Sequence, residues 1–202
     1  MQLVVGLGNP GDRYAQTRHN AGFWFADLLA SRAGEAFSRQ AKFHGELARF
    51  TLAGADLRVL KPETYMNRSG QAIAAVCRFF RIPPAGVLVV HDELDLPPGA
   101  VRLKLGGGAG GHNGLRDTIS HIGAEFWRLR VGVGHPGHRN QVTDYVLSRA
   151  RAEEESEIRD ALAAAADALE VMLARGSEAA MQQLHSRGRK PRPYRKADDA
   201  AS

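Results

Sequence analysis

The amino-acid sequence predicts an α/β fold, in which a single compact domain is built on a central mixed β-sheet flanked by helices. Short apolar runs alternate with segments of helical periodicity along most of the chain. Two strand-like runs on either side of a glycine turn predict an antiparallel hairpin, which makes the sheet mixed. A length of 202 residues suits one domain with a substantial core.

The first part of the chain predicts a strand, a helix and the hairpin. Residues 2–6 are a short apolar run ended by glycine, and residues 20–32 carry apolar side chains at helical spacing. Residues 46–52 and 56–60 flank a turn at residues 53–55 and have the β-branched or aromatic content of strands. We therefore expect the two hairpin strands at these positions.

The middle of the chain continues the alternation. Residues 69–81 have helical apolar spacing, Pro83 and Pro84 stop that helix, and residues 87–91 resume as a buried strand. Further elements are expected as a strand at 101–105, a glycine-rich loop at 106–111, a helix at 113–122 and a strand at 128–133.

The C-terminal part predicts two helices and a tail. Residues 153–174 form a long alanine-rich helix whose first turns concentrate glutamates, which favour the positive end of the helix dipole. A second helix is expected at residues 177–185, so the domain spans residues 1–185. Residues 186–202 are basic, contain two prolines and lack apolar periodicity, and we expect a disordered tail there.

Composition narrows the classes of function. No apolar run approaches the roughly 18 residues of a membrane span, and the N-terminus lacks the features of a secretory signal, so we expect a cytoplasmic protein. Cys77 is the only cysteine, which excludes an internal disulfide and a cysteine-rich metal site. The net charge is +5: residues 1–150 and the tail are basic, whereas residues 151–185 are acidic. A basic body with a basic tail suits a polyanionic partner such as nucleic acid, although basic tails are also common solubility devices.

Residues 6–11 match the G-x-G-x-x-G pattern of a dinucleotide site after a strand. A nicotinamide site would also need an acidic residue about 20 positions further on, at the end of the second strand. Asp27 lies inside a predicted helix instead. We therefore favour a glycine-lined turn that places Asn9 at the mouth of the sheet.

His19 and Asp92 are the candidates for acid–base chemistry. His19 comes just before a helix, and Asp92 directly follows a buried strand, at the end where open α/β sheets bind ligands. Taken singly, each could merely cap a local turn or helix. A metal set of His91, Asp92 and Asp95 is a further alternative, but it lacks a regular ligand spacing.

Other motifs exclude further chemistries. The run at residues 106–114 has no Gly-Lys-Ser/Thr ending, so it is not a nucleotide triphosphate loop, although with Lys104 it could hold an extended anionic strand. Residues 132–138 hold two histidines in an ordinary loop context. Cys77 lies on the apolar face of its helix and is expected to be a core thiol. Since no G-x-S-x-G motif occurs, hydrolysis would use water activated by a base.

Six motifs in order resemble those of the bacterial peptidyl-tRNA hydrolase family: VGLGNPG, TRHNAG, ETYMNRSG, HDELDLPPG, GGHNGLRD and RLRVGVGHPG. The resemblance runs from Leu3 to about His185. It implies an enzyme that cleaves the ester bond between a peptide and tRNA, so that tRNA from aborted translation is recycled. It also implies a monomer that works without metal or organic cofactor, with peptidyl-tRNA as its partner.

The resemblance assigns roles to individual residues. His19 corresponds to the general base, Asp92 to the carboxylate that orients it, and Asn9 to the amide that senses a blocked amino group. Residues at positions that contact the peptide or the tRNA acceptor end are Tyr14, Tyr65, Asn67 and Asn113. Lys104 and Arg130 look like the basic pair near the tRNA 5′-phosphate. The alternative from another class is a non-catalytic RNA-binding protein on the same scaffold. The presence of Asn9, His19 and Asp92 argues against this alternative.

Overall fold

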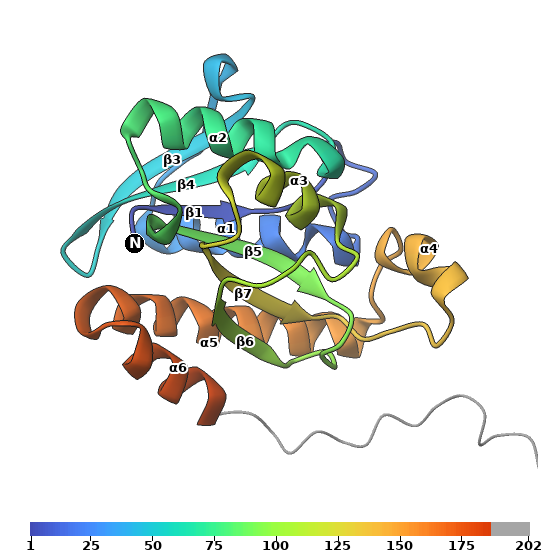
Figure 1. Ribbon diagram of the computed structural model, residues 1–202. Coiled ribbons are helices and arrows are strands. Elements are labelled where there is room, and N and C mark those ends of the chain that lie inside the picture. Colours follow the sequence, from blue (N-terminus) through green and yellow to red (C-terminus); the bar gives the residue numbers. More distant parts are fainter. Residues whose placement is uncertain (187–202) are drawn as a thin grey trace, which may run out of the picture.

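The computed structural model describes residues 1–186 and arranges them around one seven-stranded sheet (Figure 1). The strand order is β2-β3-β4-β1-β5-β7-β6. In chain order the strands are β1 (Leu3–Gly6), β2 (Ser38–Gln40), β3 (Gly45–Leu52), β4 (Ala55–Pro62), β5 (Val87–Glu93), β6 (Val101–Leu105) and β7 (Trp127–Gly132). β4, β1, β5 and β7 are parallel, whereas β2, β3 and β6 pair antiparallel to their neighbours. The expected mixed sheet is confirmed.

The described residues form six α-helices, of which five cover the two faces of the sheet and α4 lies beyond the ends of the strands (Figure 1). They are α1 (Ala21–Ala33), α2 (Ser69–Phe80), α3 (Asn113–Ile122), α4 (Val142–Val146), α5 (Ala152–Arg175) and α6 (Ser177–Ser186). α1, α5 and α6 bury one apolar cluster against the sheet, with Phe25 and Leu162 at its centre, while α2 and α3 bury the other around Ile73 and Phe126. Cys77 belongs to this second cluster, and burial raises the pKa of its thiol to about 11, which confirms a core thiol.

The expected helices and strands agree with the observed ones to within about two residues, and two elements were not expected. β2 is short and wholly polar at an edge of the sheet, and α4 is a single short helix, so neither has a periodic apolar pattern. β5 runs two residues further than expected and therefore carries Asp92 on the strand itself. Apart from Ser186, which ends α6, the expected tail lies outside the described residues.

The glycines of the first motif allow close packing between α1 and the sheet. A Cβ at Gly6 would lie 2.2 Å from the carbonyl oxygen of Gly22, and a Cβ at Gly22 would lie 2.4 Å from the carbonyl oxygen of Val90. α1 begins only at Ala21 and does not follow the glycine turn directly, as the helix of a dinucleotide fingerprint does. The motif is therefore a packing device that brings the loop bearing Asn9 to the end of β1.

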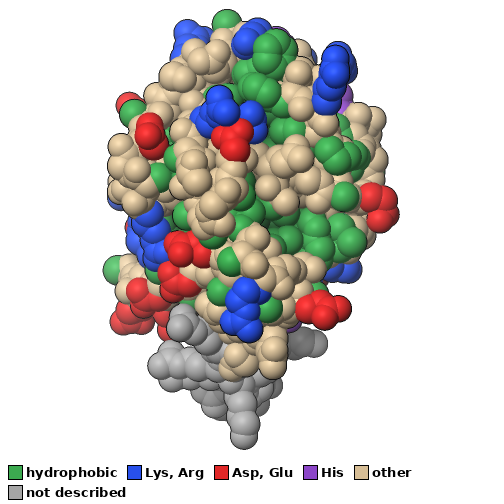
Figure 2. Space-filling model, turned by 90° about the vertical axis from the view of Figure 1, so that its left-hand side faces the viewer, with side chains coloured by type: hydrophobic (Ala, Val, Ile, Leu, Met, Phe, Trp, Pro, Cys, Tyr) green, Lys and Arg blue, Asp and Glu red, His purple; other side chains and the backbone are tan. Residues whose placement is uncertain are grey.

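On the face shown in Figure 2, Lys and Arg side chains lie along the top and at scattered positions further down, and a group of Asp and Glu side chains lies at the lower left. The acidic first turn of α5 belongs to the lower layer in Figure 1. Within residues 1–186, no helix has the length and apolar character needed to cross a membrane.

Candidate active site

A cleft of about 570 Å³ opens where β1 and β5 end. Its walls come from the end of β5, the loop before α3, the segment before α2, and α4. The parallel strands all point their carboxyl ends toward this edge, which is where open α/β sheets bind ligands. Asn9, His19 and Asp92 all line the cleft.

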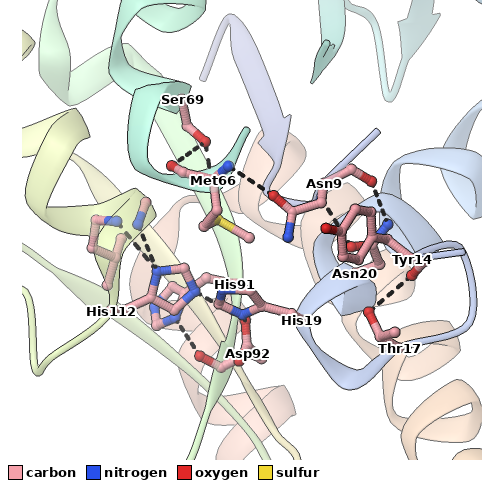
Figure 3. A network of polar contacts seen from close by, with 12 residues as sticks. Asn9, Tyr14, Thr17, His19, Asn20, Met66, Ser69, His91, Asp92 and His112 are labelled. Carbon is pink, nitrogen blue, oxygen red and sulfur yellow. Dashed lines mark hydrogen bonds and ion pairs between the residues drawn. The ribbon is translucent and has the colours of Figure 1, made fainter. Parts of the chain in front are cut away.

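Asp92 sits at the centre of the site and accepts hydrogen bonds from two histidines (Figure 3). Nδ1 of His19 and Nε2 of His112 each lie 2.9 Å from Oδ1 of Asp92. His19 belongs to a 3-10 turn, Arg18–Asn20, that leads into α1, and His112 is the residue that caps the N-terminus of α3. The Asp92 side chain is only 2% exposed, so the bonds form away from bulk water.

Backbone contacts fix the protonation pattern of this trio. Nδ1 of His112 accepts from the backbone N–H of Gly114 at 3.1 Å and of Leu115 at 3.3 Å, so Nε2 carries the hydrogen that is donated to Asp92. The ionised carboxylate can only accept, so His19 donates its Nδ1 hydrogen to it. The lone pair on Nε2 of His19 is thereby left free to take a proton.

The negative charge of Asp92 changes the pKa of His19. Burial disfavours the imidazolium form of His19, but the charge of Asp92 and its hydrogen bond outweigh burial and raise the pKa of His19 above its ordinary value. Burial also opposes ionisation of Asp92, yet His19 and His112 hold its pKa well below the usual range. Asp92 is therefore ionised at neutral pH, and an imidazolium at His19 would be stabilised.

His91 lies beneath the same site as a neutral residue. Its Nδ1 donates to the backbone carbonyl of Asp92 at 2.8 Å, and its ring lies edge-on to that of His112 with centroids 5.2 Å apart. Burial, followed by the neighbouring His112, lowers the pKa of His91 to about 3. His91 therefore supports the site as packing and does not share its charge.

Asn9 is held in one orientation by three hydrogen bonds (Figure 3). Its backbone exchanges two bonds with the side chain of Asn20, each 2.9 Å long. Its side-chain oxygen accepts from the backbone N–H of Met66 at 2.8 Å. The amide –NH₂ is thus the group that Asn9 can offer to a ligand in the cleft.

The other residues singled out from the sequence fall into two groups. Tyr65, Asn67 and Asn113 line the cleft, and Tyr65 is 56% exposed. Tyr14 lies outside the cleft lining, with the guanidinium of Arg13 4.5 Å from its ring centroid.

Lys104 and Arg130 also lie outside the cleft, on the antiparallel pair of strands β6 and β7. Lys104 stands opposite Arg128 across the two strands, and Arg102 stands opposite Arg130. Directly paired positions share a face, so the four cations lie on one face of this strand pair. Arg130 is paired with Glu93 at 2.9 Å.

With this geometry in place, comparison with known proteins identifies the family. A family model described as peptidyl-tRNA hydrolase matches residues 3–192. The chain belongs to the peptidyl-tRNA hydrolase family. It is therefore an enzyme, and the resemblance seen in the six sequence motifs is confirmed.

Relatives in this family match nearly the whole chain. The peptidyl-tRNA hydrolase of Alkalilimnicola ehrlichii is 56% identical over 189 residues, which is 93% of this chain and 96% of the relative. That of Azoarcus sp. is 56% identical and covers 92% of this chain and 85% of its own. The crystal structure of peptidyl-tRNA hydrolase from Acinetobacter baumannii superposes with a TM-score of 0.89 at 48% identity, covering 91% of this chain and 94% of the other.

The sequence interpretation missed two members of the site. His112 and Asn20 stand inside motifs of the peptidyl-tRNA hydrolase family, but neither was assigned a role. The signal for His112 was the same as for His19, a histidine directly before a helix. Asn20 is only 1% exposed and its side chain bonds the backbone of Asn9, a contact that no local pattern in the sequence indicates.

The tautomer of His112 also argues against a metal in this peptidyl-tRNA hydrolase site. Among residues 1–186, His19, Asp92 and His112 form the single group whose ligand atoms lie close enough for a metal, within 4.8 Å of one another. Nε2 of His112 carries a hydrogen and so has no lone pair to offer. The set His91, Asp92 and Asp95 considered from the sequence does not form such a group in the described chain. The three residues fit a proton-handling role better than a metal site.

Proposed function

We propose that this enzyme hydrolyses the ester bond of peptidyl-tRNA with His19 as the general base and Asp92 as the residue that orients it. The observation that carries the proposal is the bond between Nδ1 of His19 and Asp92, which in the neutral imidazole places the lone pair on Nε2 of a residue that lines the cleft. A histidine oriented by a carboxylate is suited to activate water.

The reaction follows from this geometry. Nε2 of His19 takes a proton from water as the water oxygen attacks the ester carbonyl, and Asp92 stabilises the imidazolium that forms. The tetrahedral intermediate then breaks the bond to the ribose oxygen. His19 returns the proton to that leaving oxygen, which yields a free peptide acid and tRNA with its terminal hydroxyl restored.

Asn9 is proposed to select substrates whose amino group is blocked. Its oxygen is already occupied by the N–H of Met66, so its –NH₂ can donate to the carbonyl of a peptide link. A free ammonium only donates and cannot accept this bond. Peptidyl-tRNA and N-acetyl-aminoacyl-tRNA should therefore be preferred over free aminoacyl-tRNA.

The tRNA side of the substrate is proposed to use the exposed rim of the cleft. Tyr65 offers an exposed aromatic surface for stacking on a terminal nucleotide, and Asn67 and Asn113 add amide groups beside it. Lys104 and Arg130 would meet phosphates of the acceptor stem, and Tyr14 would offer a further aromatic surface. All these groups come from one chain, so we further propose a monomer that acts in the cytoplasm.

A hydrolysis assay tests the proposal against the non-catalytic alternative. Purified protein is incubated with N-acetyl-aminoacyl-tRNA and with free aminoacyl-tRNA, and release of the acyl group is followed. We expect rapid release from the blocked substrate and slow release from the free one. Tight binding without release would instead support an RNA-binding protein on this scaffold.

A further inference from the structure

We infer that Arg128 is a positioning residue that holds the glycine-rich loop at residues 106–111, so that backbone N–H groups of the loop join Lys104 in binding a phosphate of the tRNA substrate. The inference rests on the proposed function and extends it to a residue outside the cleft. Arg128 neither lines the cleft nor touches the reacting atoms.

Arg128 is a buried cation whose side chain donates its hydrogen bonds to the glycine-rich loop. It is only 3% exposed, and its two terminal nitrogens donate to the carbonyl oxygens of Gly107 and Gly108. Its guanidinium also lies 4.7 Å from the ring centroid of Phe126. No carboxylate forms an ion pair with it within residues 1–186. Such a fork contacting two successive carbonyls fixes the direction of both peptide planes.

The same two contacts determine where the loop's N–H groups point. In a planar trans peptide the N–H points opposite to the carbonyl of the preceding residue. Carbonyls of Gly107 and Gly108 that face Arg128 therefore direct the N–H groups of Gly108 and Ala109 away from it. Gly107 and Gly108 are exposed, and neither of these N–H groups has a partner in the part of the chain described here. Two adjacent outward N–H groups are suited to bind an anion.

Lys104 lies next to Gly107, the residue before these N–H groups. Its Nζ would lie 3.4 Å from a Cβ added at Gly107, and Cζ of Arg128 would lie 3.8 Å from the same point, so two cations flank one glycine. Gly107 has a φ of +110°, which side chains rarely adopt, and the absence of a side chain leaves this space open. Lys104 stands opposite Arg128 on the paired strands, so the positive charge near this part of the loop favours a bound anion.

The loop continues into the wall of the cleft but is anchored separately at its far end. Ala109 lines the cleft, and His112 is held by Asp92 and by the N-terminus of α3. Loss of the Arg128 contacts should therefore disturb phosphate binding and leave the histidines in place. The expected signature is an effect on KM that depends on the tRNA part of the substrate.

Arg128→Lys tests this inference because it keeps the charge and removes the two-pronged contact. With N-acetyl-aminoacyl-tRNA we expect KM to rise about tenfold and kcat to stay within about twofold, while the salt dependence of binding falls by about one phosphate contact. With N-acetyl-aminoacyl-adenosine, which has no phosphate, both constants should be unchanged. Arg102→Lys is the matched control, since Arg102 lies on the same face but makes no contact with the loop.

Equal losses on both substrates, or an unchanged KM for tRNA, would overturn the inference. A second measurement covers the case in which the variant does not fold. The wild-type protein is titrated with a phosphorylated RNA minihelix, and the backbone amide resonances of Gly108 and Ala109 are followed by NMR. We expect the chemical shifts of both resonances to change. Unchanged chemical shifts would refute the phosphate site. Failure of the proposed function has a different signature, because the wild-type protein would then release no acyl group from either substrate.

Discussion

The backbone N–H of Met66 donates to the side-chain oxygen of Asn9 at 2.8 Å, across a sequence separation of 57 residues. Because the side-chain oxygen of Asn9 already accepts this bond, only its –NH₂ group remains to donate a hydrogen bond into the cleft. The selectivity proposed for Asn9 would therefore depend on how the segment before α2 packs on the loop after β1.

Substitutions of Asn9 should change substrate preference in two different directions. Asn9→Ala should erode the preference for blocked over free aminoacyl-tRNA by about 1 to 3 kcal/mol, the value of one buried hydrogen bond. Asn9→Asp keeps an acceptor for Met66 and offers a carboxylate to the substrate, so it should favour the free ammonium. The ratio of kcat/KM for the two substrates measures both effects, and a ratio that stays constant in both variants would place discrimination elsewhere in the cleft.

His19→Ala should lower kcat by about 10²-fold or more, because a general base typically contributes 10² to 10⁴. Affinity for tRNA should be retained, since no tRNA contact is proposed for this ring. His121→Ala serves as a control, because His121 lies on α3 and bonds only within its own helix region. Turnover close to normal in His19→Ala would refute the assignment of the base.

Asp92→Asn should slow hydrolysis and move its pH dependence. The negative charge of Asp92 helps to raise the pKa of His19, so its loss should lower that pKa and shift the acidic limb of kcat/KM to lower pH. An amide can also hold the imidazole in the wrong tautomer, which should cost about 10²-fold or more in rate. A pH–rate profile measured from pH 5 to 9 would contradict this assignment if neither its position nor its height changed.

His91 should make the fold sensitive to acid. Its folded pKa of about 3 lies below the unfolded value near 6.5, so the unfolded chain takes up a proton first and stability falls as pH drops below 6.5. The loss should approach about 1.4 kcal/mol per pH unit, or roughly 2 kcal/mol by pH 5. The raised pKa of His19 acts in the opposite direction, because its protonation favours the folded state.

His91→Asn isolates this contribution, because the amide can still donate to the carbonyl of Asp92 but does not titrate. Urea unfolding at pH 7 and pH 5 should show a smaller drop in the free energy of unfolding for this variant than for the wild type. The same drop in both proteins would mean that His91 does not control acid stability.

Local patterns in the chain were enough to predict the α/β class, the order of most elements and their ends. Apolar spacing reports which side of a helix or strand is buried, and this information lies within a few residues. His19, Asp92 and Asn9, which the motifs of the family resemblance singled out, line one cleft, and their catalytic roles stay predictions. The short elements β2 and α4 were not predicted, because they bury too little apolar surface to give the sequence a periodic apolar pattern.

The tertiary structure alone decided how these side chains meet. His19 and Asp92 are 73 positions apart, and the sharing of one carboxylate oxygen with His112 depends on strand order and on where α3 begins. Backbone groups far along the chain fix the direction of the Asn9 amide and the contact of Arg128 with the glycine-rich loop. The tautomer of His112 is set by backbone N–H groups in the first turn of α3. Hydrogen bonds require distances near 3 Å, and no local pattern fixes distances between separate elements; only the packed sheet and its helices do.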